Sequence, residues 1–478
     1  MINIKKIKKG VKLFVLLNFF SQAFSLVTTI WVARILTPSD YGLIEMAGIF
    51  VGYIVLFGQL GVGVAVVQRK QNTQEELSSL FWFMCAWGGG LCLVGVLLAY
   101  PTSWLFDNTA VIRLTQVSSI MFLAGGISIV PRNILERNMK FGIIGVAEGG
   151  GAVVSSCVML IMAKLGFGVW TLIVGQIVKE YFTVITILCL SNWKPSLFFC
   201  FDKIRPYLKF GLNVAFTNSL YYVYSKSDRF LGGKFFGSRM LGEYSFTLQL
   251  SMIPRDKIVY FINRFAFPLL AANQGSSEDL KSIYLKLLRV ISFVICPLYA
   301  GGCLLANDLI LSLLGDKWNV IIFPFQVLCL TQIVLSISSL NKFVINAIGK
   351  PSINLYFSIA SMVIIPVAFF ICAKTGFFWM LIPWVTVIPV IALMHHFVLI
   401  KMLNISFLFS LRGLFHGIVG SLVMSITILL LKEFFLVDRI FIVSNLNVVL
   451  QVIVGAAVYF AYCYSFNREM LSLVKSLR

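Results

Sequence analysis

Long apolar segments follow one another along almost the whole of this 478-residue chain. They begin near Leu13, and the short connections between them carry charged residues, proline or glycine. A helix that crosses a lipid bilayer needs roughly 20 consecutive, mostly apolar residues. The pattern therefore predicts about fourteen membrane-spanning helices and leaves no stretch long enough for a soluble domain.

The range of each expected helix follows from where an apolar run meets a charged residue, a proline or a glycine. The first begins near residue 13, the second near 41, the seventh near 210 and the eighth near 241. The others are expected near 79–99, 114–131, 143–163, 167–190, 287–306, 321–345, 353–373, 377–399, 413–431 and 446–464.

Composition places the chain among all-α integral membrane proteins. Hydrophobic residues make up 59% of the sequence and charged residues 12%, against about 25% charged residues in soluble domains. The formal net charge of +20 would suit a nucleic-acid partner, but in a membrane protein such an excess gathers in cytoplasmic loops. The ten cysteines have neither CxxC nor Cys/His ligand spacing. We therefore expect no nucleic acid, no metal site and no cofactor.

Lysine and arginine are distributed unevenly between alternate connections. The N-terminal MINIKKIKKGVK, the connection after residue 190 and the C-terminal segment are all basic and fall on one side. Because cytoplasmic connections carry the excess of positive charge, we expect both termini in the cytoplasm and an even number of spans. The first apolar run is long and lacks a small-residue cleavage site, so we expect a retained helix and not a signal peptide.

Two pairs of similar segments indicate an internal repeat. AKLGFGVWTLI, from Ala163, matches AKTGFFWMLI, from Ala373, with one residue gapped. A weaker match places RILTPSDYG at 34–42 over KFFGSRMLG at 234–242. Each copy of the stronger repeat opens an even-numbered span, so the two halves have the same orientation in the membrane. Parallel repeats of this kind occur in transporters, whose sites lie between the halves.

The repeat divides the chain into three predicted parts. Residues 1–200 form an N-terminal six-helix lobe and residues 201–402 a second six-helix lobe, while residues 403–478 add two helices and a cytoplasmic tail.

Several stretches resemble one protein family. They are ARILTPSDYGLIEMA, FGQLGVGVAVVQR, PRNILERNMKF, FGLNVAFTNSLYYVYSKSDRFLGGKFFGSRMLGEYS, LLGDKWNVIIFPFQVL and NAIGKP. In this order and spacing the chain is similar to Wzx-type polysaccharide flippases of the multidrug/oligosaccharidyl-lipid/polysaccharide exporter superfamily. The branch of colanic-acid and teichuronic-acid exporters is the most similar. The resemblance runs from about Lys9 to Lys350, and the last third agrees mainly in helix number.

The resemblance implies a V-shaped pair of six-helix lobes around a central cavity. It also implies translocation of undecaprenyl-diphosphate-linked oligosaccharide units across the inner (plasma) membrane of a bacterium, for capsule, exopolysaccharide or O-antigen synthesis. Basic residues of the cavity wall would meet the diphosphate and acidic sugars. The implied partners are membrane lipid, a coupling proton or sodium ion, and the polysaccharide polymerase machinery.

The stretch YYVYSKSDRFLGGKFFG, residues 221–237, places three charged side chains inside the expected seventh span. An ionisable side chain within lipid is costly and usually marks a functional path. With a helix start near residue 210, Lys226 lies about 24 Å along the helix. Lys226 and Arg229, spaced i, i+3, then share one face with Tyr222.

Three interpretations of this stretch stay open. In the first, Lys226 and Arg229 line a cavity and bind phosphate, with Asp228 as their local partner or as an ion-coupling carboxylate. In the second, Asp228 and Arg229 form a buried structural pair. In the third, the helix ends early and these residues reach the outer surface.

Further polar residues fall inside other expected spans. The cavity candidates are Arg255, Lys257 and Lys179 as cations, Asp256, Glu148 and Glu180 as coupling or partner carboxylates, and Asn18 and Asn218 as polar groups beside Tyr222. Pro254 before the PRDK cluster could kink its helix, and an interfacial place for that cluster is the alternative. For Lys179 and Glu180 a bond to a neighbouring helix is the preferred interpretation. His395 and His396 are expected at the membrane interface.

Three functions from different classes compete. A flippase works by alternating access without covalent chemistry, so it is not an enzyme. A membrane polymerase needs a sizeable outer catalytic loop, and the connections here are too short for one. A drug or small-solute exporter of the same superfamily usually has a more acidic cavity than these cationic candidates suggest. No P-loop, GxGxxG or HExxH motif supports ATP-driven or hydrolytic chemistry.

Overall fold

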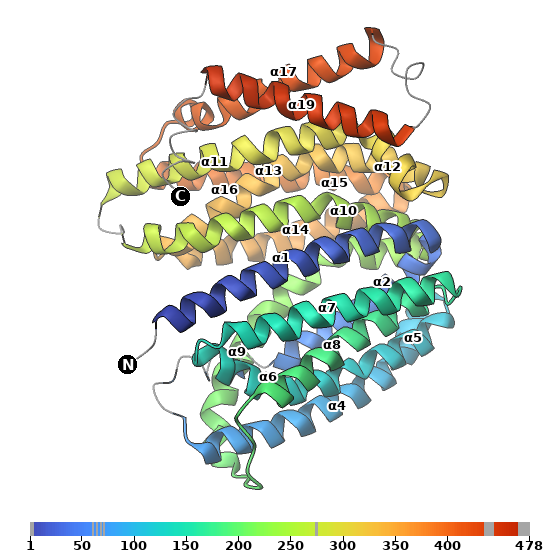
Figure 1. Cartoon of the computed structure of the whole chain (residues 1–478), viewed down its shortest axis with the longest axis vertical. Helices are drawn as coiled ribbons and strands as arrows, with labels where there is room; N and C mark the ends of the chain where they lie inside the picture. Colours follow the sequence, from blue (N-terminus) through green and yellow to red (C-terminus); the bar gives the residue numbers. More distant parts are fainter. Residues whose placement is uncertain are drawn as a thin grey trace. The chain divides into compact units, whose positions relative to one another are not determined.

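The computed structural model describes residues 4–59, 62–63, 66, 69, 72–272, 276–434 and 444–466. Every regular element in these ranges is a helix, which confirms the predicted all-α class (Figure 1). The chain divides into two compact units, Met1–Gly242 and Glu243–Arg478. The predicted boundaries at residues 200 and 402 concern lobes of a membrane fold and stay a prediction.

The first unit contains the helices from α1 to α9. Their bounds are α1 Ile4–Ile35, α2 Pro38–Gln59, α4 Gln74–Phe106, α5 Ala110–Ser119, α6 Met121–Arg137, α7 Phe141–Lys164, α8 Trp170–Leu190 and α9 Phe201–Ser225. Helix α7 packs along both α1 and α8, and α4 packs along α5 and α6. Buried side chains such as Met46, Val111 and Leu114 join α2 to α5. The apolar faces of these helices thus pack mainly on one another, both between helices adjacent in sequence and between helices far apart in it.

The second unit contains the remaining helices, after α10, which begins in the first unit. Their bounds are α10 Ser227–Ala272, α11 Ser277–Leu304, α12 Ala306–Leu314, η1 Asp316–Ile321, α13 Ile322–Ala347, α14 Pro351–Thr375, η2 Phe378–Leu381, α15 Ile382–Val385, α16 Val387–Met402, α17 Phe407–Phe434 and α19 Ser444–Phe466. Helix α11 is central, because α13 packs along one side of it and α17 along another.

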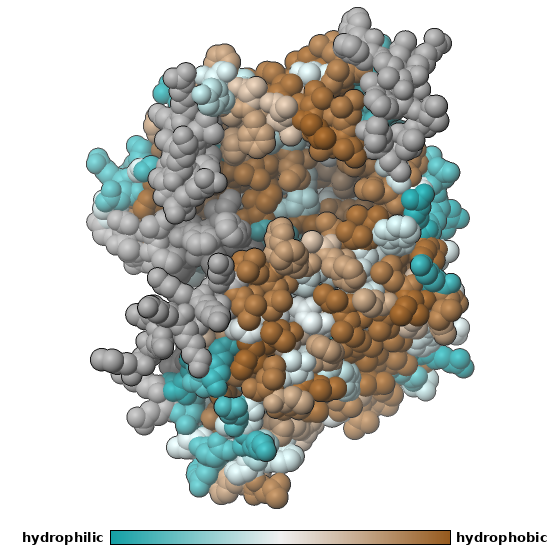
Figure 2. Space-filling model, in the orientation of Figure 1, coloured by the Kyte–Doolittle hydropathy of each residue, from teal (hydrophilic) through white to brown (hydrophobic). Residues whose placement is uncertain are grey.

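Twelve helical segments in the described ranges are long and apolar enough to cross a membrane, so this is a multi-pass membrane protein. The predicted spans one to six and nine to fourteen coincide with these twelve. The predicted seventh and eighth spans fall on α9 and α10, which are not among them, and the total of fourteen stays a prediction. Figure 2 shows hydrophobic residues over the middle of the helices and hydrophilic ones toward helix ends.

The stronger internal repeat has the same structural role in both copies. Helix α7 ends at Lys164, and Gly166 follows with a φ of 79°. Helix α14 ends at Thr375, and Gly376 follows with a φ of 145°. A positive φ is readily adopted by glycine alone, since it lacks a β-carbon. Each copy therefore ends one helix and turns the chain into the next.

The weaker repeat is visible as a close crossing of α2 and α10 inside the first unit. A β-carbon on Gly42 would overlap the backbone oxygen of Ser238, and one on Gly242 would overlap the backbone oxygen of Pro38. The two contacts are reciprocal, since 38 and 238, like 42 and 242, are paired in the predicted alignment. Related positions of the two halves thus meet backbone to backbone.

Candidate functional site

The first polar cluster joins α2 to the junction of α9 and α10, within the first unit. Lys226 Nζ lies 2.9 Å from Glu45 Oε1, and Arg229 Nε lies 3.3 Å from the same oxygen. The two cationic side chains are 29% and 13% exposed, and Asp228 is buried. A single carboxylate on α2 therefore serves as counter-ion for both predicted cavity cations.

The junction between α9 and α10 determines where Lys226 and Arg229 lie. The predicted helix runs through Lys226, but α9 ends at Ser225 and Lys226 caps it with φ −112° and ψ 0°. The Lys226 backbone N–H donates to Tyr222, and its carbonyl accepts from the N–H of Phe230 in the first turn of α10. Because α9 begins at Phe201, earlier than expected, Lys226 lies about 37 Å along it and not 24 Å. The i, i+3 spacing still brings Lys226 and Arg229 to one partner.

Tyr222 holds α9 against the same face of α2. Its hydroxyl donates to the backbone oxygen of Ile49 over 2.9 Å, and its ring lies 6.0 Å from that of Tyr53. A β-carbon on Gly52 would overlap the Tyr222 hydroxyl, so this position must be small. Glu45, Ile49, Gly52 and Tyr53 follow the helical spacing of one face. That face of α2 carries both the counter-ion Glu45 and the backbone oxygen that binds the Tyr222 hydroxyl.

The sequence analysis did not single out Glu45. A usable signal was present, because Glu45 is a carboxylate about one turn inside the second expected span, where an ionisable residue is costly. It was passed over because it lies in a long apolar run with no neighbouring charge. Its partners lie more than 180 positions later in the chain.

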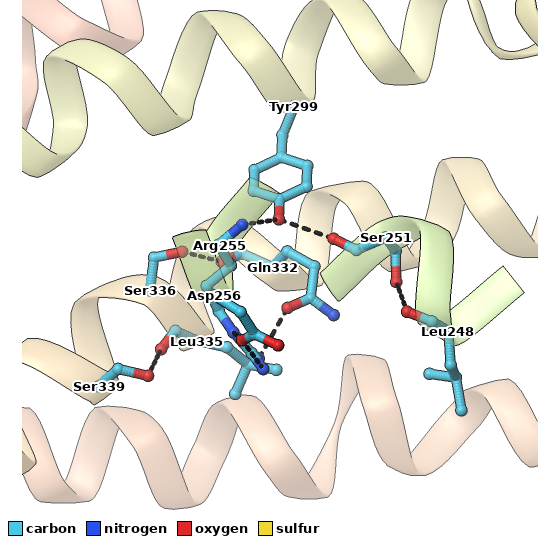
Figure 3. A network of polar contacts seen from close by, with 9 residues as sticks. All are labelled: Leu248, Ser251, Arg255, Asp256, Tyr299, Gln332, Leu335, Ser336 and Ser339. Atoms are coloured by element: carbon cyan, nitrogen blue, oxygen red, sulfur yellow. Dashed lines mark hydrogen bonds and ion pairs between the residues drawn. The ribbon is translucent and has the colours of Figure 1, made fainter. Parts of the chain in front are cut away.

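The second polar cluster lies in the second unit, where α10 meets α11 and α13 (Figure 3). Arg255 donates through Nη1 to Gln332 Oε1 over 2.8 Å and through Nε and Nη2 to Asp256 Oδ1 over 3.1 and 2.9 Å. The side chain of Arg255 is 17% exposed, whereas that of Asp256 is 61% exposed. The guanidinium is thus fixed on its buried side and faces a solvent-accessible carboxylate on the other.

The surroundings of Arg255 restrict it further. Tyr299 accepts a hydrogen bond from the Arg255 backbone N–H over 3.0 Å and donates to the backbone oxygen of Ser251 over 2.7 Å. Gln332 is fully buried, and its Nε2 has no hydrogen-bond partner within the described ranges. Lys342 lies near enough for its charge to interact with that of Arg255. A fixed arginine, a spare amide donor and a lysine suit an anion with several oxygens.

The other predicted residues do not join these clusters. Lys257 and Lys179 are exposed, and Glu180 is half-buried. Lys179 and Glu180 were expected to bond to a neighbouring helix, but within the described ranges neither side chain has such a bond. Asn18 Nδ2 donates to the Phe14 backbone oxygen of its own helix over 3.0 Å. The side chain of Asn218 lies outside the described part of the chain.

Glu148 has a cationic partner that the sequence analysis did not foresee. Arg132 Nη2 lies 2.5 Å from Glu148 Oε1, and Arg132 Nε lies 3.2 Å from Glu136 Oε1. This three-residue cluster joins α6 to α7 in the first unit. A carboxylate already engaged by arginine is a poor candidate for a coupling ion, so the pair favours a structural role for Glu148.

The expectation that His395 and His396 lie at the membrane interface concerns their depth in the bilayer and stays a prediction, but the structure shows that both are enclosed by protein. Both are buried on α16, where His396 Nδ1 lies 3.2 Å from the Tyr284 hydroxyl and Nε2 lies 3.1 Å from Ser410 Oγ. His395 Nε2 lies 2.7 Å from Asn354 Oδ1. These polar partners come from three other helices, α11, α14 and α17, so no local pattern around the histidines predicts them. The network is internal to the second unit.

No group of three or more His, Cys, Asp or Glu side chains in the described ranges could hold a metal ion.

The comparison with protein families decides the classification. Residues 31–323 match the family model described as polysaccharide biosynthesis protein. The chain belongs to this family.

Curated relatives of this polysaccharide biosynthesis family member come from several bacteria. A membrane protein of the cps region of Klebsiella pneumoniae is 23% identical over 93% of this chain and 92% of its own length. The succinoglycan biosynthesis transport protein ExoT of Rhizobium meliloti is 22% identical over 96% of this chain and 92% of its own. The lipopolysaccharide biosynthesis protein WzxC of Escherichia coli is 22% identical over 64% of this chain, and the match spans 63% of its length.

Solved structures share the fold of this family member. The lipid II flippase MurJ in an inward closed conformation matches with a TM-score of 0.78 and 15% identity over 96% of this chain and 99% of MurJ. An inward-facing multidrug resistance MATE family transporter of the MOP superfamily matches with a TM-score of 0.62 and 15% identity over 80% of this chain and 94% of its own. The fold is therefore that of MurJ and of MATE transporters, in agreement with the resemblance read from the sequence.

Proposed function

We propose that this protein is a flippase for oligosaccharide units linked to undecaprenyl diphosphate, acting in the cytoplasmic membrane of a bacterium with both termini in the cytoplasm. The match of residues 31–323 to the polysaccharide biosynthesis family carries this proposal. It is supported by relatives named for succinoglycan transport and lipopolysaccharide biosynthesis, and by a fold shared with a lipid II flippase. Twelve candidate spans give the chain the architecture of a transporter.

The two polar clusters suggest how a diphosphate is recognised. In each, an arginine already meets a carboxylate of its own unit: Arg229 meets Glu45, and Arg255 meets Asp256. Phosphate oxygens accept hydrogen bonds from the same donors. When a diphosphate takes the place of the carboxylate, one anion replaces another and the arginine keeps a counter-ion. This exchange avoids the cost of leaving a buried cation unpaired.

The same exchange offers a place for ion coupling. Once displaced from Arg229, Glu45 is a carboxylate whose side chain is only 24% exposed. A proton or a sodium ion would neutralise it, since burial disfavours an unpaired charge. Substrate binding and ion binding would then favour each other through a shared carboxylate. Asp256 is 61% exposed, so burial gives it no comparable tendency to bind an ion.

A deletion strain tests the proposed function. Loss of the gene should cause a lipid-linked glycan to accumulate in the inner leaflet and should abolish the corresponding surface polysaccharide. Wild-type protein should restore the polymer, whereas Arg255→Gln should not, although it reaches the membrane in normal amounts. Arg255→Lys should restore it in part, because charge remains without the bidentate fork.

Lys164→Gln is a matched control, since Lys164 is an exposed cation at the end of α7, outside both clusters. Full polymer with Arg255→Gln would remove Arg255 from the proposed site. A deletion strain with normal polymer and altered drug resistance would instead favour the alternative function, a drug or small-solute exporter. Failure of chain elongation with normal translocation would point to the polymerase machinery.

A further inference from the structure

A third polar site lies in the second unit, where α11, α17 and α19 meet, and shares no residue with the second cluster. Gly413 and Gly417 are spaced four residues apart on α17 and face α11. A β-carbon on Gly417 would lie 2.8 Å from the backbone of Ser292, and one on Gly413 would lie 3.1 Å from Leu288. Ser292 Oγ also donates to the Gly413 backbone oxygen over 3.1 Å. Small residues at this spacing let two membrane helices approach closely.

The close approach leaves a cavity of about 560 Å³ beside it. Its lining includes Arg289 from α11, Arg412 and His416 from α17, and Phe466 from the end of α19. Arg289 is half-buried and Arg412 is exposed. The cavity thus combines two arginines with aromatic walls, in a volume typical of small-ligand sites.

The position along the helices places this cavity at a predicted membrane surface. Helix α17 has 28 residues and is about 42 Å long, close to the thickness of a bilayer with its headgroups. Arg412 is five residues after the first residue of α17, and Phe466 is the last residue of α19. Both helix ends belong to the side predicted as cytoplasmic. Arg412 therefore lies at headgroup level, with aromatic rings beside it, and Arg289 lines the same cavity.

We propose that this cavity binds the phosphate headgroup of an anionic membrane phospholipid, such as phosphatidylglycerol. Arg289 and Arg412 hold the phosphate oxygens, and His416 completes the polar wall. Phe415 and Phe466, which are 56% and 68% exposed, lie beside the acyl chains. Arginine binds phosphate through two parallel N–H donors, and basic pockets between helices at the cytoplasmic surface are suited to anionic lipids. The proposal does not depend on what the protein transports.

Native mass spectrometry of the purified full-length protein tests this site. Delipidated wild-type protein is titrated with phosphatidylglycerol or with zwitterionic phosphatidylcholine. We expect one tightly retained phosphatidylglycerol and no equivalent phosphatidylcholine. Arg412→Gln should weaken retention about tenfold, the loss of about one strong phosphate interaction, and Arg412→Lys should weaken it less. Arg289→Gln combined with Arg412→Gln should abolish tight retention.

Lys286→Gln and Lys401→Gln are matched controls, because both lysines are exposed on the same predicted side and outside the lining. Equal losses in the controls and in Arg412→Gln would contradict a specific site. Competition by millimolar inorganic phosphate would identify a soluble-anion site, and retention of undecaprenyl diphosphate in place of phosphatidylglycerol would assign the cavity to the transported lipid. Either result overturns the proposal. Because Arg412 is exposed, its single substitution tests the site even where the double variant unfolds.

Discussion

Glu45 holds two cations on one carboxylate oxygen, so the charge of the first cluster depends on a single side chain. Removing that charge takes one ion pair from Lys226 and one from Arg229. Both side chains are largely buried. A buried charge that loses a counter-ion is costly. The counter-ion therefore has more effect on the unit's stability than either cation alone.

Replacing Glu45 by Gln should lower the stability of the protein by about 1–3 kcal/mol, because two partly buried cations each lose an ion pair. Thermal unfolding in detergent measures the change. Adding Lys226→Met to Glu45→Gln should recover part of the loss, as expected for residues in contact. Glu180→Gln on α8 is the control and should be close to neutral. Additive effects of the Glu45 and Lys226 substitutions would show that the pair is not coupled.

The buried histidine network makes a second residue-scale prediction. The Tyr284 hydroxyl donates to Asn341 Oδ1 over 2.9 Å and lies 3.2 Å from His396 Nδ1. Tyr284→Phe leaves a buried acceptor unsatisfied and should cost about 1–3 kcal/mol of stability. Tyr356→Phe, at a position that is 71% exposed, should change nothing. Equal melting temperatures for both variants would argue that the network does not stabilise the second unit.

At the scale of elements, the crossing of α2 and α10 allows no side chain at its contact. Gly42→Ala should destabilise the first unit by about 2 kcal/mol or more, because the methyl group meets the Ser238 backbone, which cannot rotate away. Gly48→Ala on the same helix should be neutral or stabilising, because its β-carbon meets nothing and alanine favours the helix. Thermal unfolding of the two variants side by side measures the difference. A stable Gly42→Ala protein would mean that the helices do not cross so closely.

The apolar runs and the repeat were enough to predict most elements of the fold. Bilayer thickness sets helix length, so twelve expected spans coincide with twelve observed segments. The break at Lys226 corresponds to the open alternative in which the helix ends early. It was not the first interpretation, because nothing in YSKSDRF resembles a common helix terminator such as glycine or proline. The site was predicted only in part. The sequence predicted Lys226, Arg229 and Arg255, because each is a charged residue inside an expected span. Their partners Glu45 and Gln332 are distant in sequence, and only the fold brings them near.

At the scale of the whole molecule, charge asymmetry predicts orientation. With both termini in the cytoplasm, the turn between α7 and α8 around Gly166 faces the outside. A reporter that is active only in the cytoplasm should be active when fused to either terminus and inactive when inserted after Gly166. Each insertion is checked for membrane localisation. Activity at all three sites, or at Gly166 alone, would contradict the predicted orientation.

Translocation by the purified protein is the most direct test of the central claim. Proteoliposomes would receive an oligosaccharide linked to undecaprenyl diphosphate, and a membrane-impermeant glycosidase would report how much of it reaches the outer leaflet. The account predicts fast transfer with the wild-type protein, background transfer with Arg255→Gln, and wild-type transfer with Lys164→Gln. Transfer at the background rate by folded wild-type protein, with an ion gradient of either proton or sodium imposed, would contradict it.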